Sequence, residues 1–252
     1  MEGRFRTQLV EHAYIEPEAG VAVPEGDGLT LYCVSQGVHY IRSEIAAMLG
    51  WPSTRVRVVQ TVVGGAFGGK IEPSVHPYIA LLAVKTGRPV RLVYTREESM
   101  VATTKRHPTV IDMRLAADAG GRLLGGEARI IADTGAYTSY GPAVATRAAV
   151  LAFGPYNIPS VKVESLAVHT NNPIAGAMRG FGVPQIAVAH EQLMDTLAER
   201  IGVAPLAVRR LNGFTAGDAV TPTGQRLEKG VGLMATLEKA VEGWARGGGE
   251  RA

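Results

Sequence analysis

The sequence has 252 residues, 46% hydrophobic and 19% charged, so it is long enough to bury a core and too apolar to be intrinsically disordered. Its 26 Lys and Arg residues exceed its 23 Asp and Glu residues by only three and are spread along the chain, which argues against a nucleic-acid partner. Cys33 is the single cysteine, so the chain has no internal disulfide and no cysteine-ligated zinc or iron–sulfur site.

The first third of the chain shows alternating strand and helix patterns. Residues 16–28 form a Pro/Gly-rich stretch, and residues 29–34 then predict a strand. Ser35 is the expected N-cap of a helix whose apolar residues fall on one side and which ends at Gly50. A Val-rich run over residues 55–63 predicts a second strand that leads directly into a run of glycines.

The rest of the chain continues this mixture. Helical spacing after residue 75 stops at Gly87 and precedes a short strand over residues 90–94, and the two β-like runs between residues 109 and 132 flank a turn at 118–121. An extended region over 161–168, an amphipathic helix over 184–201 and a short helix over 205–211 follow. Strands and helices without strict alternation predict an α+β fold with mixed sheets and packed helices. We expect one domain over residues 1–245 and a flexible tail over 246–252.

Neither a membrane span nor a leader is expected. The longest apolar runs fall far short of the roughly 20 residues that a bilayer-spanning helix needs. Residues 1–20 lack the apolar stretch of a secretory signal. The sequence therefore predicts a cytoplasmic protein.

The glycine run Gly64-Gly-Ala-Phe-Gly-Gly-Lys70 is the most informative segment. Glycines between a strand and a helix let backbone N–H groups approach an anionic ligand closely. The spacing meets most of the phosphate-loop pattern of nucleotide-binding proteins, but Ile71 stands where that pattern needs Ser or Thr to hold magnesium. A glycine-rich turn that binds no ligand is the alternative interpretation of this segment.

A second loop, residues 177–185, precedes the long helix. In it Arg179 offers a fork of hydrogen-bond donors beside Gly180 and Gly182, and Phe181 offers an aromatic wall. A single loop of this kind is usually an ordinary helix entry, but two glycine-rich loops that each carry a phenylalanine are more specific.

Together these loops resemble the two cofactor loops of the xanthine dehydrogenase and aldehyde oxidase family, in its large, molybdopterin-binding subunit. The resemblance covers nearly the whole chain in order, through segments 11–18, 34–36, 64–70, 85–90, 95–98, 106–108, 155–159, 179–185 and 209–212. It implies a molybdenum-cofactor-binding domain that forms the first half of a catalytic subunit.

The family resemblance also implies roles for particular residues. The cofactor-binding residues would be Gly65, Phe67, Gly68, Gly69, Arg179 and Gly180. The backbone of Phe67 and Arg179 would lie near molybdenum, without side-chain ligation. Phe181 would orient a flat substrate, and Arg147 would bind it.

What the chain lacks is equally informative. Where purine-oxidising members of the family place a substrate-binding glutamate, this chain has Ile71, with Glu72 one position later, which puts a purine substrate in doubt. No catalytic residue is assigned, because the family's general-base glutamate lies in a second half of the large chain. The six histidines show no HxxxH or HxH spacing, so a protein-ligated metal is not expected.

The resemblance implies a molybdenum hydroxylase that oxidises a heterocycle or aldehyde with oxygen from water. The cofactor would be molybdenum–molybdopterin, with the cytosine dinucleotide as one form. Expected partners are a second molybdopterin-binding half or chain, an iron–sulfur subunit, an FAD subunit and a small-molecule substrate. A non-catalytic family domain without metal and a phosphate-loop nucleotide-binding protein stay open as alternatives.

Overall fold

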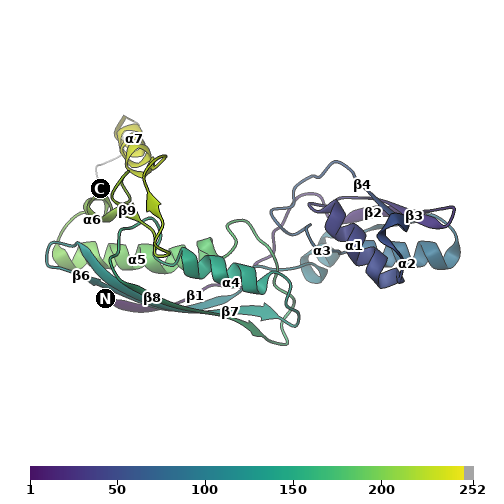
Figure 1. Cartoon of the computed structure of the whole chain (residues 1–252), viewed down its shortest axis with the longest axis horizontal. Helices are drawn as coiled ribbons and strands as arrows, with labels where there is room; N and C mark the ends of the chain where they lie inside the picture. Colours follow the sequence, from purple (N-terminus) through teal and green to yellow (C-terminus); the bar gives the residue numbers. More distant parts are fainter. Residues whose placement is uncertain (247–252) are drawn as a thin grey trace.

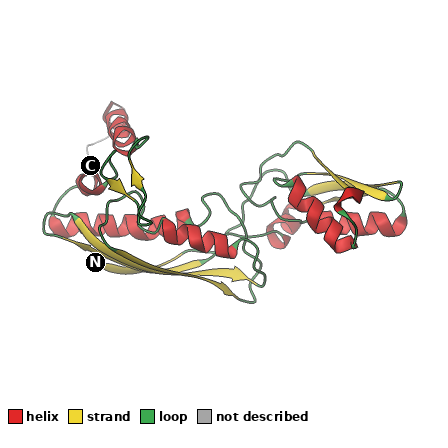
Figure 2. Ribbon diagram, in the orientation of Figure 1, coloured by secondary structure: helices red, strands yellow, loops and turns green. Residues whose placement is uncertain are grey.

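The computed structural model describes residues 1–246, and the chain forms an elongated molecule of two lobes (Figures 1 and 2). The small lobe holds residues 19–102, and the large lobe is built from the N-terminal strand and the chain from residue 109 onward. Each lobe has its own hydrophobic core. The mixture of sheets and helices confirms the predicted α+β class, but the two cores lie within the single predicted domain.

The small lobe is a four-stranded sheet with strand order β4-β3-β2-β5, packed against two helices. β3 pairs parallel with β4 and antiparallel with β2. Its elements are β2 (Ala19–Glu25), β3 (Gly28–Cys33), α1 (Val38–Leu49), the short 3-10 helix Ser53–Arg55, β4 (Val56–Gln60), α2 (His76–Thr86), β5 (Val90–Val93) and α3 (Arg96–Ala102). Ile41, Ile45 and Ile79 from the two helices are fully buried over the sheet.

Two details of the small lobe differ from the predictions. The N-cap of α1 is Gly37 and not Ser35, whose hydroxyl instead accepts a hydrogen bond from the Gly37 amide at 2.9 Å. The Pro/Gly-rich stretch contains the strand β2. That strand tolerates Pro24 because this residue lies beyond the part of β2 that pairs with β5. Its missing N–H therefore interrupts no bond to β5. The helix stops at Gly50 and Gly87, both left-handed, are confirmed.

The large lobe is a second four-stranded sheet, with order β1-β6-β7-β8, whose inner face is covered by helices (Figure 2). Its elements are β1 (Glu2–Arg6), β6 (Thr109–Ala117), β7 (Leu123–Gly135), α4 (Gly141–Val150), β8 (Val161–His169), α5 (Val183–Ile201) and α6 (Pro205–Asn212). Alternate residues of β6 face Leu193 and Met194 of α5 in the core. β8 pairs parallel with β7, with α4 in the connection between them.

The predicted hairpin is confirmed, and it is fastened to the helices. Gly121 at its turn has φ +86°, a conformation that favours glycine. The buried Asn212 side chain accepts a hydrogen bond from Leu123 N and donates one to Gly121 O, each 2.9 Å long. These bonds satisfy backbone groups of the turn while fixing α6 to the end of the sheet.

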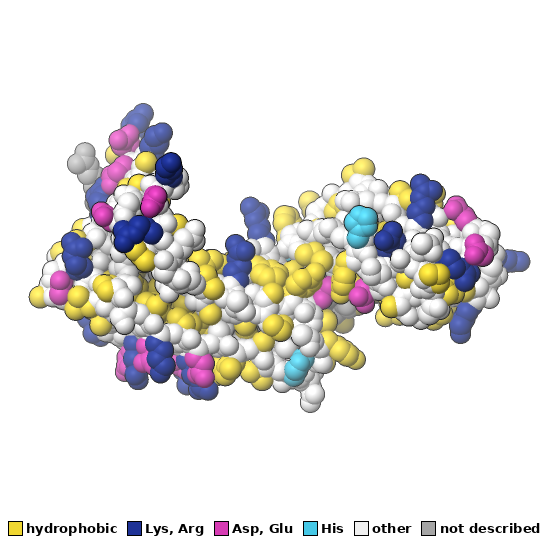
Figure 3. Space-filling view, in the orientation of Figure 1, with side chains coloured by type: hydrophobic (Ala, Val, Ile, Leu, Met, Phe, Trp, Pro, Cys, Tyr) yellow, Lys and Arg dark blue, Asp and Glu magenta, His cyan; other side chains and the backbone are white. Residues whose placement is uncertain are grey.

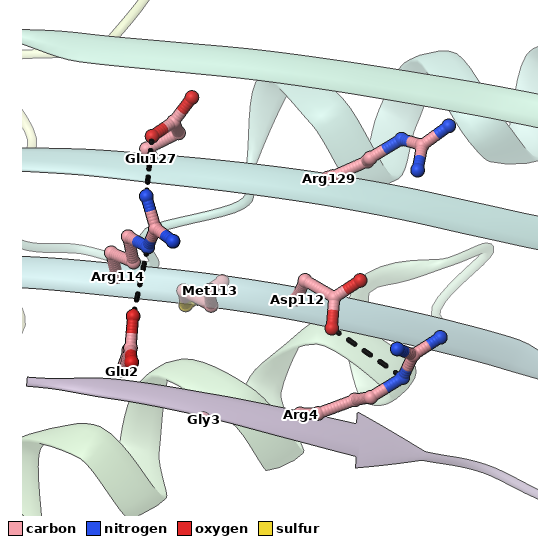
Figure 4. Close-up of a pocket in the computed structure, with 8 residues that line it drawn as sticks. All are labelled: Glu2, Gly3, Arg4, Asp112, Met113, Arg114, Glu127 and Arg129. Carbon is pink, nitrogen blue, oxygen red and sulfur yellow. Dashed lines mark hydrogen bonds and ion pairs between the residues drawn. The ribbon is translucent and has the colours of Figure 1, made fainter.

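The outer face of the large sheet carries rows of alternating charge. Figure 4 shows Arg114 between Glu2 and Glu127, and Arg4 beside Asp112, in a shallow hollow. In Figure 3 basic and acidic side chains gather along the lower edge of this lobe. Each exposed ion pair of this kind contributes little to stability. We therefore interpret this face as a solvated surface.

The C-terminal part forms a small arm beside α6 (Figure 1). It contains the strand pair β9 (Ala219–Val220) and β10 (Arg226–Leu227), and α7 (Leu233–Arg246). Residue 246, predicted to begin the tail, is the last helical residue, and 247–252 lie outside the described residues. Among the helices within residues 1–246, none has the length and apolarity needed to cross a bilayer.

Candidate functional site

The two phenylalanine-bearing loops come from different lobes and meet where the lobes join. The Arg179 amide donates to the Phe67 carbonyl oxygen at 2.8 Å. A Cβ on Gly68 would lie 2.6 Å from the Ala177 carbonyl oxygen, so only glycine permits this approach. The structure therefore brings together the two segments that the sequence had singled out, although about 110 residues separate them.

Both loops have unusual backbone conformations. Phe67 and Phe181 each have φ +52°, a left-handed conformation that side-chain-bearing residues rarely adopt. Gly68 at φ +105° and Gly180 at φ +90° adjoin them. Such backbone strain, of order 1–3 kcal/mol per residue, persists where the surrounding contacts impose it and is concentrated at functional sites.

Gln36 holds the first loop and was not assigned a role from the sequence. Its side-chain oxygen accepts from the amides of Gly68 at 3.1 Å and Lys70 at 3.3 Å, and its backbone amide donates to Lys70 O at 2.8 Å. The only signal was its place in the segment 34–36, directly after a strand.

Lys70 is buried inside the protein, which contradicts the phosphate-loop alternative. Its ammonium donates to the Glu16 carboxylate at 2.9 Å and to the Glu16 carbonyl oxygen at 2.7 Å, and it lies over the Tyr14 ring. Burial opposes ionisation of Glu16, but the hydrogen bonds from Lys70 and Gly64 outweigh burial and lower its pKa. A lysine held this way braces the base of the loop and cannot reach a nucleotide phosphate.

Arg106 and His12 hold the second loop. The Arg106 guanidinium donates to Arg179 O at 2.9 Å and to the Gln185 side chain at 3.1 Å. His12 Nε2 lies 2.7 Å from Ala177 O, and burial lowers the pKa of His12. Residues 11–12 and 103–107 therefore form a polar belt between the lobes against which both loops rest.

The donors left over by these bonds suit an anionic group. Within residues 1–246, the amides of Gly65, Ala66 and Phe67 on one loop, and of Gly180 and Gly182 on the other, donate to no acceptor of the chain. The guanidiniums of Arg106 and Arg179 at this junction form no ion pair within the same residues. Free amides beside unneutralised cations are the chemistry that holds a phosphate-bearing cofactor, so the residues present fit such a group.

The residues predicted to bind substrate lie on the large-lobe side. Phe181 is partly buried, and its ring packs edge-on against Tyr140 with centroids 5.9 Å apart. Arg147 is exposed on α4, the helix whose Val144 and Ala148 pack against Gly182 of the second loop. Phe181 thus lies against the N-terminal end of α4, whereas Arg147 is in the last turn of that helix. Tyr140 is an aromatic residue to which the sequence analysis assigned no role.

Glu72 lies near this group. Its carboxylate accepts a hydrogen bond from the Ser139 hydroxyl. Burial raises the pKa of Glu72, and the Ser139 bond acts in the opposite direction. Across residues 1–246, no group of three or more His, Cys, Asp and Glu side chains could hold a metal ion.

The fold defines a molybdopterin-binding class of domain. Residues 1–213 match the family described as "Molybdopterin cofactor-binding domain", and the chain belongs to that family.

Particular relatives sharpen this placement. The chain is 46% identical over 243 residues to the nicotinate dehydrogenase large molybdopterin subunit of Eubacterium barkeri, covering 96% of this chain and 57% of that protein. It is 46% identical over 202 residues to a probable xanthine dehydrogenase component of Bacillus subtilis, covering 80% of this chain and 27% of that protein. The structure of an aldehyde oxidoreductase from Desulfovibrio gigas matches with a TM-score of 0.92 at 33% identity, covering 98% of this chain and 27% of that one. The chain thus spans from about a quarter to just over half the length of these relatives.

Proposed function

We propose that this chain is the first cofactor-binding part of a molybdenum hydroxylase that oxidises a nitrogen heterocycle or an aldehyde. The observation that carries the proposal is the junction of the two loops, where backbone amides donate to no acceptor of the chain within residues 1–246, and where Arg106 and Arg179 form no ion pair within the same residues. The relatives named for nicotinate, xanthine and aldehyde support this class of substrate.

The residues of this chain would bind and orient. Gly65, Phe67, Gly68 and Gly69 on the small lobe, with Arg179 and Gly180 on the large lobe, would hold the molybdenum–molybdopterin cofactor through their backbone. When bound, that group supplies the redox and oxygen-transfer chemistry. Phe67 and Arg179 would present their backbone to its metal end, as no side chain there is a metal ligand.

Substrate binding would fall to the large lobe. The Phe181 ring, fixed against Tyr140, offers an apolar wall for a planar ring. Arg147 is exposed and, among the described residues, without an ion pair, so it suits a carboxylate or carbonyl group on the substrate. Ile71 in place of an acidic residue favours a substrate other than a purine.

The remaining machinery would come from other parts of the enzyme. We assign the general-base glutamate to a second molybdopterin-binding half or chain, and the electron acceptors to iron–sulfur and FAD subunits. The cytosine dinucleotide is the extension of the cofactor that we favour. We place the assembled enzyme in the cytoplasm.

Substitutions in the assembled enzyme test these assignments. Phe67→Ala and Arg179→Ala are expected to reduce the molybdenum content or turnover, because the first removes an exposed aromatic side chain from the loop that would bind the cofactor, and the second removes a guanidinium available to an anionic cofactor. Arg147→Ala is expected to raise KM by about tenfold, the effect of one charge-assisted hydrogen bond, with little change in metal content. Arg200→Ala, an exposed arginine at the far end of α5, is the control. Wild-type metal content and turnover in both loop variants would refute the site. A loss of metal in Arg147→Ala as large as its rise in KM would make that residue structural.

The alternative is a family domain that folds but never holds metal. The free amides and strained phenylalanines argue against it, because a domain without a ligand gains nothing from keeping this backbone strain.

A further inference from the structure

The corner between β7 and α4 contains a strained residue with a specific partner. Ser139 has φ +41°, in the left-handed region that a serine rarely adopts. Its hydroxyl donates to one carboxylate oxygen of Glu72, which lies just after the glycine loop of the small lobe. A residue held in this region needs contacts that impose the conformation, and the Glu72 bond is such a contact.

Glu72 is itself confined on its other side. A Cβ on Gly176 would lie 2.6 Å from the second Glu72 carboxylate oxygen, so the glycine makes room for the carboxylate. The same carboxylate borders a cavity of about 290 Å³, together with Ser139, Tyr40 and Thr104. Thr104 is buried, and its hydroxyl has no hydrogen-bond partner within the described residues. The Glu72 carboxylate is therefore held between the Ser139 hydroxyl on one side and Gly176 on the other.

The strained corner leads directly to the aromatic wall. Tyr140 follows Ser139 and is the N-cap residue of α4. Its ring meets the Phe181 ring at an interplanar angle of 67°, the edge-to-face arrangement that aromatic pairs prefer. A change in the backbone at Ser139 would therefore move the adjoining Tyr140 ring and alter its contact with Phe181.

We propose that Glu72 and Ser139 are positioning residues that set the Tyr140–Phe181 aromatic pair, and through it the fit of a planar ring substrate. This inference rests on the proposed function in one respect, that Phe181 lines the substrate site. The Glu72–Ser139 hydrogen bond joins the segment after the glycine loop of one lobe to the substrate side of the other. It would therefore also fix the position of the cofactor-binding surface relative to the substrate-binding surface.

The test compares two substitutions of Glu72 in the assembled enzyme. Glu72→Gln keeps an oxygen that accepts from Ser139, whereas Glu72→Ala removes it. We expect Glu72→Ala to raise KM for a heterocyclic substrate by about tenfold with less than a roughly twofold change in kcat, and Glu72→Gln to stay within about twofold of wild type in both. Molybdenum content should not change in either variant. Glu127→Ala, which removes an exposed carboxylate on the far face of the sheet, is the matched control.

A second measurement does not depend on activity. Hydrogen exchange of residues 136–150 should speed up in Glu72→Ala and in Ser139→Gly, which tolerates the backbone conformation but lacks the hydroxyl, and not in Glu72→Gln. Unchanged exchange and KM in Glu72→Ala, or a Gln variant that behaves as the Ala variant does, would overturn the proposal. Loss of molybdenum in Glu72→Ala would overturn it as well, because Glu72 would then belong to cofactor retention. A wild-type enzyme without molybdenum would refute the proposed function instead, and the exchange result would still decide this inference.

Discussion

At the scale of single residues, the site depends on how closely two backbones approach. Phe67 O accepts from Arg179 N at 2.8 Å only because Gly68 has no side chain to meet Ala177. The sequence indicated that these glycines matter for close approach. It could not show that the surface approached is the other loop of the same chain, because nothing in either segment specifies its partner.

Gly68→Ala is expected to separate the loops and to lower the molybdenum content of the assembled enzyme about tenfold or more. The new methyl group would lie 2.6 Å from the Ala177 carbonyl oxygen, and φ +105° adds backbone strain. Metal analysis of purified variant and wild-type enzyme measures the effect.

Gly217→Ala is the matched control for this change. Gly217 has φ +87°, so it carries a similar backbone cost, but a Cβ there meets nothing within 4 Å. A loss of metal as large in Gly217→Ala as in Gly68→Ala would show that general destabilisation, and not the loop contact, is responsible.

At the scale of elements, periodicity and stop signals located most helices and strands. The helix over 184–201 and the hairpin around 118–121 have strong signals, an apolar stripe and a glycine turn, and both were predicted. α4 begins Gly-Pro and is otherwise rich in alanine, so it has little pattern to read. α3 has a start signal in the sequence, the capping box between Thr95 and Glu98, but no helix was predicted there.

The contacts between elements could not be predicted from the sequence. Nothing local indicates that β8 runs parallel to β7, or that Lys70 turns inward to Glu16 and not outward to a ligand. These choices depend on which groups become buried together, and burial is a property of the assembled fold.

Lys70→Met tests the structural role of that lysine. Removing the ammonium leaves the partly buried Glu16 carboxylate without its counter-charge, so we expect the free energy of unfolding to fall by about 2 kcal/mol. Because Glu16 has a lowered folded-state pKa, the loss should be present above its unfolded pKa and should shrink as pH falls through the folded pKa. Urea unfolding at several pH values measures both effects. Unchanged stability in Lys70→Met would contradict this role. So would nucleotide binding by the wild-type protein that Lys70→Met abolishes.

At the scale of the whole molecule, two lobes with separate cores meet through polar groups. Glu11, His12, Lys105 and His107 are all buried along this belt. Such residues look like surface residues in a sequence, which is why the junction was not predicted. Buried polar groups retained at considerable cost fix one arrangement of the lobes and so of the two loops.

The belt makes stability depend on pH through His107. Burial lowers its pKa to about 4, below the 6.5 of an exposed histidine. The unfolded state therefore binds more protons between these values, and stability is lost as pH falls through that window. We expect His107 to account for about 2 kcal/mol of the fall in unfolding free energy between about pH 7 and pH 5.

Urea unfolding of His107→Gln at the two pH values checks this expectation, since the variant should lose less stability on acidification than wild type. His39→Gln, at an exposed site on α1, is the control and should behave as wild type does. Equal pH dependence in His107→Gln and wild type would show that other groups are responsible.

We propose that this chain holds a molybdenum cofactor within a larger enzyme. The most direct test is the molybdenum-to-protein ratio of the protein isolated gently from its native host, together with the masses of the chains that co-purify. We predict molybdenum near stoichiometry and a further polypeptide that supplies the second cofactor-binding part, and we predict loss of the metal in Gly68→Ala. A metal-free protein, isolated with or without partners, would show that the chain does not hold the cofactor.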